Sequence, residues 1–181
     1  APVIERAFRK GKPAAVALVI NSPGGSPVQS SLIAARIRRL ADEAGVPVHA
    51  FVEDVAASGG YWISSQADSI VAQPSTLTGS IGVLAGKFVT TEIKEKLGLV
   101  LSDVTAGAWA SFMSANSRFT DEQWAALNRR LDEIYVDFTG KAATDRHLAI
   151  EVLEPLARGR VWTGAAPARS RHRAGRAGRA P

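Results

Sequence analysis

Ser58 lies in a run of small residues, Ala56-Ala57-Ser58-Gly59-Gly60, which the apolar residues Tyr61, Trp62 and Ile63 follow. Small neighbours let the backbone approach a substrate closely, and glycine amides are hydrogen-bond donors that no side chain covers. Such surroundings suit a serine hydroxyl that acts as a nucleophile in acyl transfer. The competing interpretation is a tight turn in which Ser58 caps a helix, because serine is a preferred N-cap residue.

A second glycine-bearing loop, Asn21-Ser22-Pro23-Gly24-Gly25-Ser26, follows an apolar run at residues 14–20. In a parallel sheet, the loops that follow the strands emerge at one edge, where ligand crevices form. The amides of Gly25 and Gly59 could then donate to a developing oxyanion while the Ser58 hydroxyl attacks the carbonyl carbon. Phosphate binding is less well supported, since the loop lacks both the Gly-Lys-Ser/Thr ending of a P-loop and a dinucleotide fingerprint.

A serine nucleophile also needs a base. The three histidines fall in a predicted strand, near the end of a predicted long helix and in the C-terminal tail, so we expect no Ser-His-Asp triad: His49, His147 and His172. The other route is a lysine whose pKa is lowered by burial. Lys87 is the lysine next to a glycine-rich loop, whereas Lys94, Lys96 and Lys141 fit solvated helix faces.

The elements that must position these loops follow an α/β order. Apolar runs predict strands at residues 14–20, 48–52, 69–72 and 99–105, and residues 78–84 predict a loop followed by a strand. Amphipathic patterns predict helices at residues 28–44, 58–67, 92–97, from 120 onward and at 150–157, after a short amphipathic segment at 1–12. The first fifty residues therefore predict a strand, loop, helix and strand joined by a right-handed crossover.

Length and composition predict one globular domain without a membrane span. The chain has 181 residues, of which 46% are hydrophobic and 22% charged, and no apolar run approaches the roughly 20 residues of a membrane helix. It begins without Met or a signal-peptide pattern, so we expect any signal peptide or membrane anchor to lie outside this sequence. With no cysteine there is neither a disulfide nor thiolate chemistry, and we expect no cofactor and no metal.

The positive charge is concentrated at the C-terminus. Residues 165–181 contain five arginines and no acid, and removing these five from the 22 basic residues leaves the rest balanced against 17 acidic residues. This basic tail has no apolar periodicity and is predicted to be disordered. No aromatic residue is interleaved to stack on bases, so we expect no nucleic-acid partner.

Four segments together resemble the signal peptide peptidase A family, also called protease IV or serine peptidase family S49. They are Asn21-Ser22-Pro23-Gly24-Gly25-Ser26, Ala56-Ala57-Ser58-Gly59-Gly60-Tyr61-Trp62-Ile63, Pro74-Ser75-Thr76-Leu77-Thr78-Gly79-Ser80-Ile81-Gly82-Val83 and Gly159-Arg160-Val161-Trp162-Thr163-Gly164. The resemblance covers residues 14–164, so we expect residues 1–164 to form a partial peptidase domain. It implies an α/β fold of the ClpP/crotonase type, with stacked strand-strand-helix units and a mostly parallel sheet.

The resemblance also implies a Ser/Lys endopeptidase that degrades remnant signal peptides or other membrane-associated peptides. Ser58 would be the nucleophile, Gly25 and Gly59 the oxyanion amides, and Ser80 the residue that hydrogen-bonds the lysine. The implied location is the periplasmic face of the bacterial inner membrane, with membrane association only through segments absent from this sequence. The implied partners are a peptide substrate and either a ring of identical subunits or a lysine-bearing other half.

The sequence departs from the family at the base. The catalytic lysine of single-length members matches Ala110, in the segment Ala106-Gly107-Ala108-Trp109-Ala110-Ser111-Phe112-Met113, and no lysine lies between Lys96 and Lys141. Residues 60–86 and 119–164 are most similar to the serine-bearing C-terminal half of double-length members, in which the other half supplies the lysine. The first sixty residues are more similar to single-length members, in which Ala110 would mean an inactive homologue.

The end of the chain departs as well. Family members continue after the Trp-Thr-Gly motif with an apolar helical segment, whereas residues 165–181 are arginine, alanine and glycine with little else. We interpret this change as a frameshifted or truncated terminus. Two other functions stay open: a catalytically inactive module for peptide binding or assembly, and a crotonase-type acyl-CoA enzyme, for which no acidic pocket or adenine-phosphate site is evident.

Overall fold

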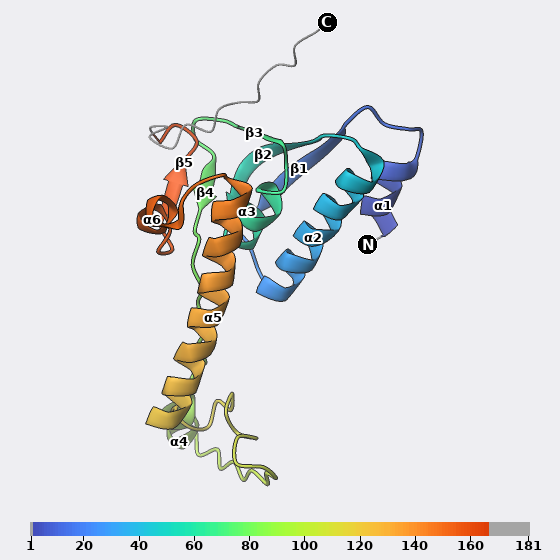
Figure 1. Ribbon diagram of the computed structural model, residues 1–181. Helices are drawn as coiled ribbons and strands as arrows, with labels where there is room; N and C mark the ends of the chain where they lie inside the picture. Colours follow the sequence, from blue (N-terminus) through green and yellow to red (C-terminus); the bar gives the residue numbers. More distant parts are fainter. Residues whose placement is uncertain (1, 167–181) are drawn as a thin grey trace, which may run out of the picture. The chain divides into compact units, whose positions relative to one another are not determined.

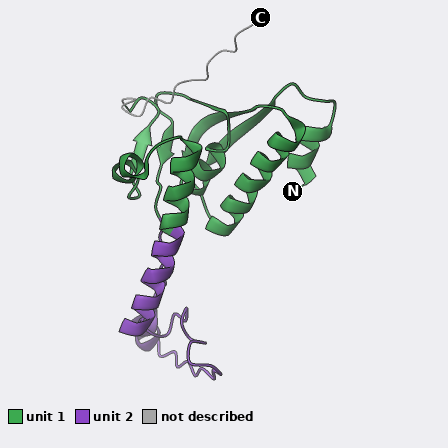
Figure 2. Cartoon of the chain, in the orientation of Figure 1, with its two compact units in different colours: residues 1–82, 135–181 green, residues 83–134 purple. Residues whose placement is uncertain are grey.

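A computed structural model of the chain describes residues 2–166 (Figure 1). The chain divides into two compact units, residues 1–82 with 135–181 as unit 1 and residues 83–134 as unit 2 (Figure 2). The predictions for the basic tail beyond Ala166, including His172, lie outside the described residues. The elements of unit 1 carry the Ser58 segment, and those of unit 2 carry Ala110.

Unit 1 is built on a mostly parallel sheet. Strand β1 (Val16–Ser22) pairs in parallel with β2 (Val48–Ala57), and β2 pairs in parallel with both β3 (Ser69–Ala72) and β4 (Leu77–Gly79) along different parts of its length. A short strand, β5 (Val161–Thr163), adds to β4 in the antiparallel direction. This arrangement confirms the prediction of an α/β fold with a mostly parallel sheet, as expected for a ClpP/crotonase-like domain.

The helices begin and end where the sequence chemistry allows. Helix α2 (Pro27–Ala44) starts with a proline, and the Ser26 side chain caps it by accepting from the Gln29 amide at 3.4 Å. Gly45 ends it in the left-handed conformation, with φ of 65°. The remaining helices are α1 (Pro2–Arg9), α3 (Gly59–Ser64), α4 (Thr91–Lys96), α5 (Asp121–Asp145), α6 (Ile150–Leu153) and the 3₁₀ helix η1 (Glu154–Leu156).

Alternating strand residues build the first core against helix α2. Helix α2 lies beside β1 and β2 (Figure 1). Val16 and Val48, on these neighbouring strands, are at most 5% exposed and pack with Ile37 and Leu40 of α2. The alternate residues of these strands point to the other face of the sheet, where Val19 of β1 is 68% exposed. A period of two along each strand therefore separates a buried face from an open one.

A second core joins α3 to the long helix α5. The rings of Trp62 and Phe138 stack with centroids 4.5 Å apart and an interplanar angle of 10°, and both side chains are 3% exposed. Ile81 and Leu153 complete this cluster. Because Trp62 lies four residues after Ser58, the same contacts that bury this ring also fix the helix that follows Ser58.

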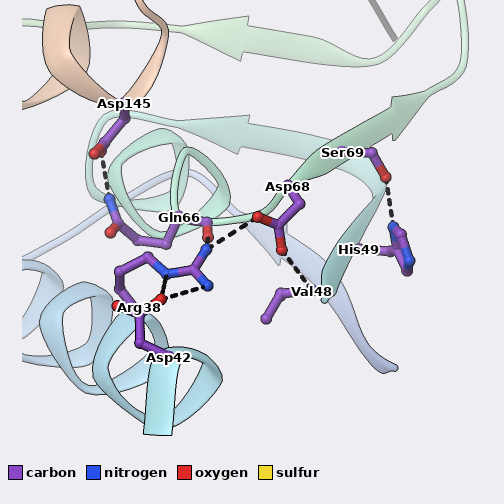
Figure 3. Close-up of polar contacts among 8 residues, drawn as sticks. All are labelled: Arg38, Asp42, Val48, His49, Gln66, Asp68, Ser69 and Asp145. Atoms are coloured by element: carbon purple, nitrogen blue, oxygen red, sulfur yellow. Dashed lines mark hydrogen bonds and ion pairs between the residues drawn. The ribbon is translucent and has the colours of Figure 1, made fainter. Parts of the chain in front are cut away.

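Polar contacts tie the loop before β3 to its neighbours (Figure 3). The Asp68 carboxylate accepts from the Val48 amide at 2.8 Å and from the Arg38 guanidinium at 3.2 Å, and Arg38 also donates to the Gln66 carbonyl. In the same view, His49 Nδ1 lies 2.7 Å from Ser69 Oγ, between two paired strands. His49 thus lies within a strand, as predicted, and its side chain links β2 to β3.

Two strand predictions need correction. Residues 99–105, predicted as a strand, form none in the described structure, because this apolar run has no strand edge to pair with there. In the loop-and-strand element predicted at 78–84, the strand precedes the loop: β4 ends at Gly79, since Gly79 and Ser80 both have positive φ, 85° and 52°. Strand β5 was not predicted. The other predicted strands and helices agree in type, with β2 extending five residues beyond the predicted 48–52.

We expect Phe138→Ala to lower the free energy of unfolding by about 3–5 kcal/mol, because it removes a buried ring from a stacked pair. Urea denaturation followed by circular dichroism measures this. The matched control is Phe51→Ala, since Phe51 is 44% exposed, and it should cost about 1 kcal/mol or less. Equal costs for the two variants would contradict the assignment of this core.

Candidate active site

Ser58 links strand β2 to helix α3 with a backbone conformation that serine rarely adopts. Its φ is 52° and its ψ is −121°. The Ser58 amide donates to the Gly79 carbonyl at 2.8 Å, and the Ser58 carbonyl accepts from the Trp62 amide at 3.0 Å. We call Ala57-Ser58-Gly59 the Ser58 turn. Because both backbone groups of Ser58 are engaged, the surroundings hold a conformation that costs free energy on its own.

The Ser58 hydroxyl does not cap the helix. Ser58 occupies the N-cap position of α3, yet its side chain makes no capping hydrogen bond, and the residue is half-buried. The capping interpretation of the Ser-Gly-Gly sequence therefore does not describe this side chain. At the N-terminus of the same helix, the first amides of α3 have no acceptor within the helix, so they are suited to bind a negative charge.

The loop after β1 lies directly against the Ser58 turn. Gly24 has φ of 115°, and a Cβ placed on it would lie 2.7 Å from Ser58 Cβ and 2.9 Å from the Gly59 amide nitrogen. A Cβ placed on Gly59 would lie 3.4 Å from the Gly25 amide nitrogen. The structure therefore brings together Gly25, Ser58 and Gly59, as the sequence predicted from the ends of parallel strands.

Close packing leaves no room for larger residues beside Ser58. A Cβ on Gly59 would collide with Ser30 Oγ on helix α2, and a Cβ on Gly60 would collide with the Ser22 carbonyl at the end of β1. Ser30 is 5% exposed, and its hydroxyl donates to the Ser26 carbonyl at 3.0 Å. The two glycines after Ser58 thus let α3 begin against β1 and α2.

Ser80 directly follows strand β4, whose last residue bonds to the Ser58 turn. It follows Gly79, whose carbonyl accepts from the Ser58 amide, and the Ser80 amide donates to the Arg160 carbonyl at 2.6 Å. Its φ is 52°, and the residue is half-buried. Ser80 is therefore the next residue after the acceptor that anchors Ser58. The sequence analysis placed the Gly24-Gly25 loop at this site, but it did not identify Arg160 as a neighbour of Ser80.

The helix that follows Ser58 carries a half-buried phenol, Tyr61. Burial raises the pKa of Tyr61 above its ordinary value, Arg146 opposes this shift, and Asp145 adds to it. Burial also lowers the pKa of the Arg146 guanidinium, while Tyr61 and Asp145 raise it. With its pKa raised, Tyr61 remains a neutral phenol at neutral pH.

Position 110 lies in unit 2, within a series of tight turns. The Ala110 amide donates to the Gly107 carbonyl at 3.1 Å, and Ala110 is exposed. Lys87 fastens the end of this segment, since its ammonium donates to the Phe112 carbonyl at 2.9 Å and lies 4.1 Å from the Phe119 ring centroid. Lys87 is therefore engaged in contacts within unit 2.

The other sequence candidates for a base also have partners elsewhere. Lys141 of α5 pairs with Asp137 at 2.7 Å, and Lys94 bonds to the Asn116 side chain. His147 follows the end of α5 with φ of 52°. In residues 2–166, no three residues among His, Asp and Glu gather in a way that could hold a metal ion.

Comparison with known proteins identifies a shared family. Residues 41–171 match the sequence profile described as Peptidase family S49. The chain is 37% identical over 161 residues to a chloroplastic serine protease SPPA of Arabidopsis thaliana, over 88% of this chain and 24% of that protein. It is 38% identical over 150 residues to protease 4 of Salmonella typhi, covering 83% and 24%.

A third relative has a different name. The chain is 40% identical over 164 residues to a Na(+)/H(+) antiporter NhaA of Brucella melitensis, over 91% of this chain and 22% of that protein. The chain thus spans about a quarter of the length of each of these relatives. None of the helices in residues 2–166 combines the length and the apolar character that a membrane span needs.

We expect Gly59→Ala to lower the free energy of unfolding by about 1–3 kcal/mol, because its Cβ meets Ser30 Oγ in a packed site. In a Ser30→Ala background the same change should cost about 1 kcal/mol less, since the colliding atom is gone. Urea denaturation of the four proteins in this cycle measures the coupling.

The control for this cycle is Gly140→Ala in helix α5, where an added Cβ has no neighbour within 4 Å. It should be neutral or stabilise the chain by up to about 1 kcal/mol. If Gly59→Ala costs the same with and without the Ser30 hydroxyl, the contact between these residues is not the cause.

Proposed function

This chain belongs to peptidase family S49, and on that premise we propose that it is the serine-bearing part of a serine endopeptidase that cleaves small-residue or apolar peptide segments. One observation carries the proposal. The hydroxyl of Ser58 makes no capping bond, and the Gly24-Gly25 loop and Gly59 lie directly against the turn that presents it. The four motifs that resemble the signal peptide peptidase A family point to remnant signal peptides as the substrate class.

In the proposed reaction, Ser58 Oγ attacks the carbonyl carbon of the scissile peptide bond and its proton passes to a base. The amides of Gly25 and Gly59 donate to the oxyanion of the tetrahedral intermediate. The intermediate collapses with loss of the amine, which takes the proton from the base, and leaves an ester between Ser58 and the peptide. Water then attacks the ester, and Ser58 recovers its proton.

We infer that the base comes from outside this chain, because Lys87, Lys94 and Lys141 contact other groups. We propose that it is a lysine supplied by another half of a double-length protein or by another subunit, with Ser80 hydrogen-bonded to it. Without a base the hydroxyl stays protonated, and loss of the base in a serine hydrolase costs on the order of 10⁴ to 10⁶ in rate. The isolated chain is therefore expected to be inactive or nearly so.

Ala110 favours a second candidate function. An alanine at the position that the resemblance gives to the lysine would leave a peptide groove without turnover, as in a peptide-binding or assembly module. The two candidates differ in one measurable way. The endopeptidase gains activity when a lysine is supplied, whereas the binding module holds peptide and does not cleave it.

We expect Ala110→Lys to raise cleavage of a fluorogenic peptide of small and apolar residues by about 10² to 10⁴-fold, since that is the range a positioned base contributes. Ser58→Ala in the same background should return the rate to that of the parent chain. Liquid chromatography of the peptide products measures both rates.

The matched control is Ala108→Lys, which places a lysine two residues away on the same exposed turn and should leave the rate at the parent level. Cleavage that survives Ser58→Ala would remove Ser58 from the mechanism. Peptide retained without turnover by both the parent and the Ala110→Lys chain would favour the binding module.

Unit 2 supports an assembly with further protein. None of residues 83–134 is buried, and four apolar side chains in it are at least 90% exposed: Leu84, Phe88, Val100 and Val104. An apolar surface of this kind marks an interaction site. We propose that another copy of the chain, in a ring, or the lysine-bearing other half covers it.

We expect sedimentation velocity to show that the chain associates as its concentration rises. The double variant Val100→Ser, Val104→Ser should raise the Kd of this association by at least about tenfold, since two exposed apolar contacts are lost. Val3→Ser is the control, because Val3 is 69% exposed on helix α1 of unit 1. A chain that stays monomeric at every concentration would contradict the ring and leave the other half as the proposed partner.

A further inference from the structure

The motif Gly159-Arg160-Val161-Trp162-Thr163-Gly164 has no role in the reaction proposed above. In the structure it forms strand β5 and the turn before it. β5 pairs with β4, and the register places Val161 opposite Gly79 and Trp162 opposite Thr78. The motif therefore lies against the residues that lead into Ser80.

Backbone contacts hold residues 79–82 along their length. The Arg160 carbonyl accepts from the Ser80 amide at 2.6 Å, and the Gly159 amide donates to the Ile81 carbonyl at 2.8 Å. A Cβ placed on Gly82 would lie 2.8 Å from Gly159 Cα, so the two glycines let the backbones touch. One segment thus fixes the backbone on both sides of Ser80.

The Trp162 ring closes over Gly79. A Cβ placed on Gly79 would lie 2.8 Å from Trp162 Cδ1 and 2.8 Å from the Arg160 carbonyl oxygen. The ring is held in turn, because Trp162 Nε1 donates to the Leu156 carbonyl at 2.9 Å. Gly79 has φ of 85°, a conformation that an alanine would strain even without this contact.

The same glycine anchors Ser58. The Gly79 carbonyl accepts from the Ser58 amide at 2.8 Å, and the β2–β4 register places Ala57 opposite Gly79. Ser58 and Ser80 both have φ of 52°. Such values cost free energy for serine and persist only where the surroundings determine the conformation. Gly79 is the residue that links the two strained serines.

We propose that Trp162, together with the backbone of Gly159 and Arg160, is a positioning element that holds Ser58 and Ser80 in their strained conformations as one unit. The inference rests on the proposed role of Ser58 as nucleophile. It assigns the fourth motif a task in catalysis although Trp162 contacts neither the substrate nor the Ser58 hydroxyl. A ring that only added stability would leave the two serine amides no more affected than the rest of the sheet.

Amide hydrogen exchange of the whole chain, followed by NMR, tests the positioning directly. Trp162→Ala should raise the exchange rates of the Ser58 and Ser80 amides by about tenfold, because local opening of β4 becomes easier. The Ala50 amide, in a fully buried part of β2, should keep its rate. Trp162→Phe, which keeps a ring over Gly79, should restore most of the protection.

Val161→Ala is the matched control, since Val161 is the neighbouring β5 residue and is 54% exposed. It should leave all three amides at their original rates. Unchanged rates at Ser58 and Ser80 in Trp162→Ala would overturn the inference. An equal increase at Ala50 would overturn it too, because Trp162 would then act on global stability alone.

A second measurement connects positioning to turnover. In the Ala110→Lys background, Trp162→Ala should lower kcat by about tenfold and leave KM within about twofold, because the ring affects the geometry of the reacting groups and not peptide binding. An unchanged kcat in an active Ala110→Lys chain would overturn the link to catalysis. If Ala110→Lys has no activity, a lysine at position 110 does not complete the site, and the exchange rates still decide whether Trp162 positions the serines.

Discussion

The strained backbone of Ser58 is the constraint on which the rest of unit 1 depends. A serine at φ of 52° needs contacts that outweigh its local cost, and three separate elements provide them. Gly79 at the end of β4 accepts from its amide, Trp62 in α3 donates to its carbonyl, and Gly24 after β1 packs against its Cβ. These three elements together hold the backbone from which the hydroxyl projects.

Burial of Trp62 connects this local strain to the stability of the fold. The Trp62 ring stacks on Phe138 in a core that residues of α2, α5 and α6 also form. The short helix α3 has six residues, too few to be stable alone, so tertiary packing must hold it. Free energy from apolar burial therefore supports a turn that the backbone alone would not adopt.

The sequence predicted the parts of the fold that depend on local chemistry. Apolar runs predicted β1 and β3, and an amphipathic pattern at 28–44 predicted α2. The rule on parallel strands predicted that the two glycine loops lie at one edge. Strand β5 was missed because its three residues acquire strand structure only by pairing with β4, about eighty positions away in the chain. The apolar run at 99–105 was wrongly predicted to be a strand, because apolar character alone does not supply a neighbouring strand to pair with.

Part of the candidate site could be predicted from the sequence, and part could not. Ser58, Gly25 and Gly59 could be placed together from the pattern of strands and loops, and the structure does place them together. The contact of Trp162 with Gly79 could not be predicted, because it depends on a left-handed glycine and on the exact pairing of β5. Contacts between distant segments set such details, and no local pattern encodes them.

The exposure of Ala110 has an evolutionary consequence. Position 110 lies in a unit without a buried residue, and its side chain makes no contribution to either core of unit 1. Lysine and alanine should therefore be nearly interchangeable there for folding while differing by orders of magnitude for the proposed chemistry. Selection for a stable protein would not oppose loss of the base, so inactive descendants with an intact Ser58 turn could arise by very few nucleotide changes.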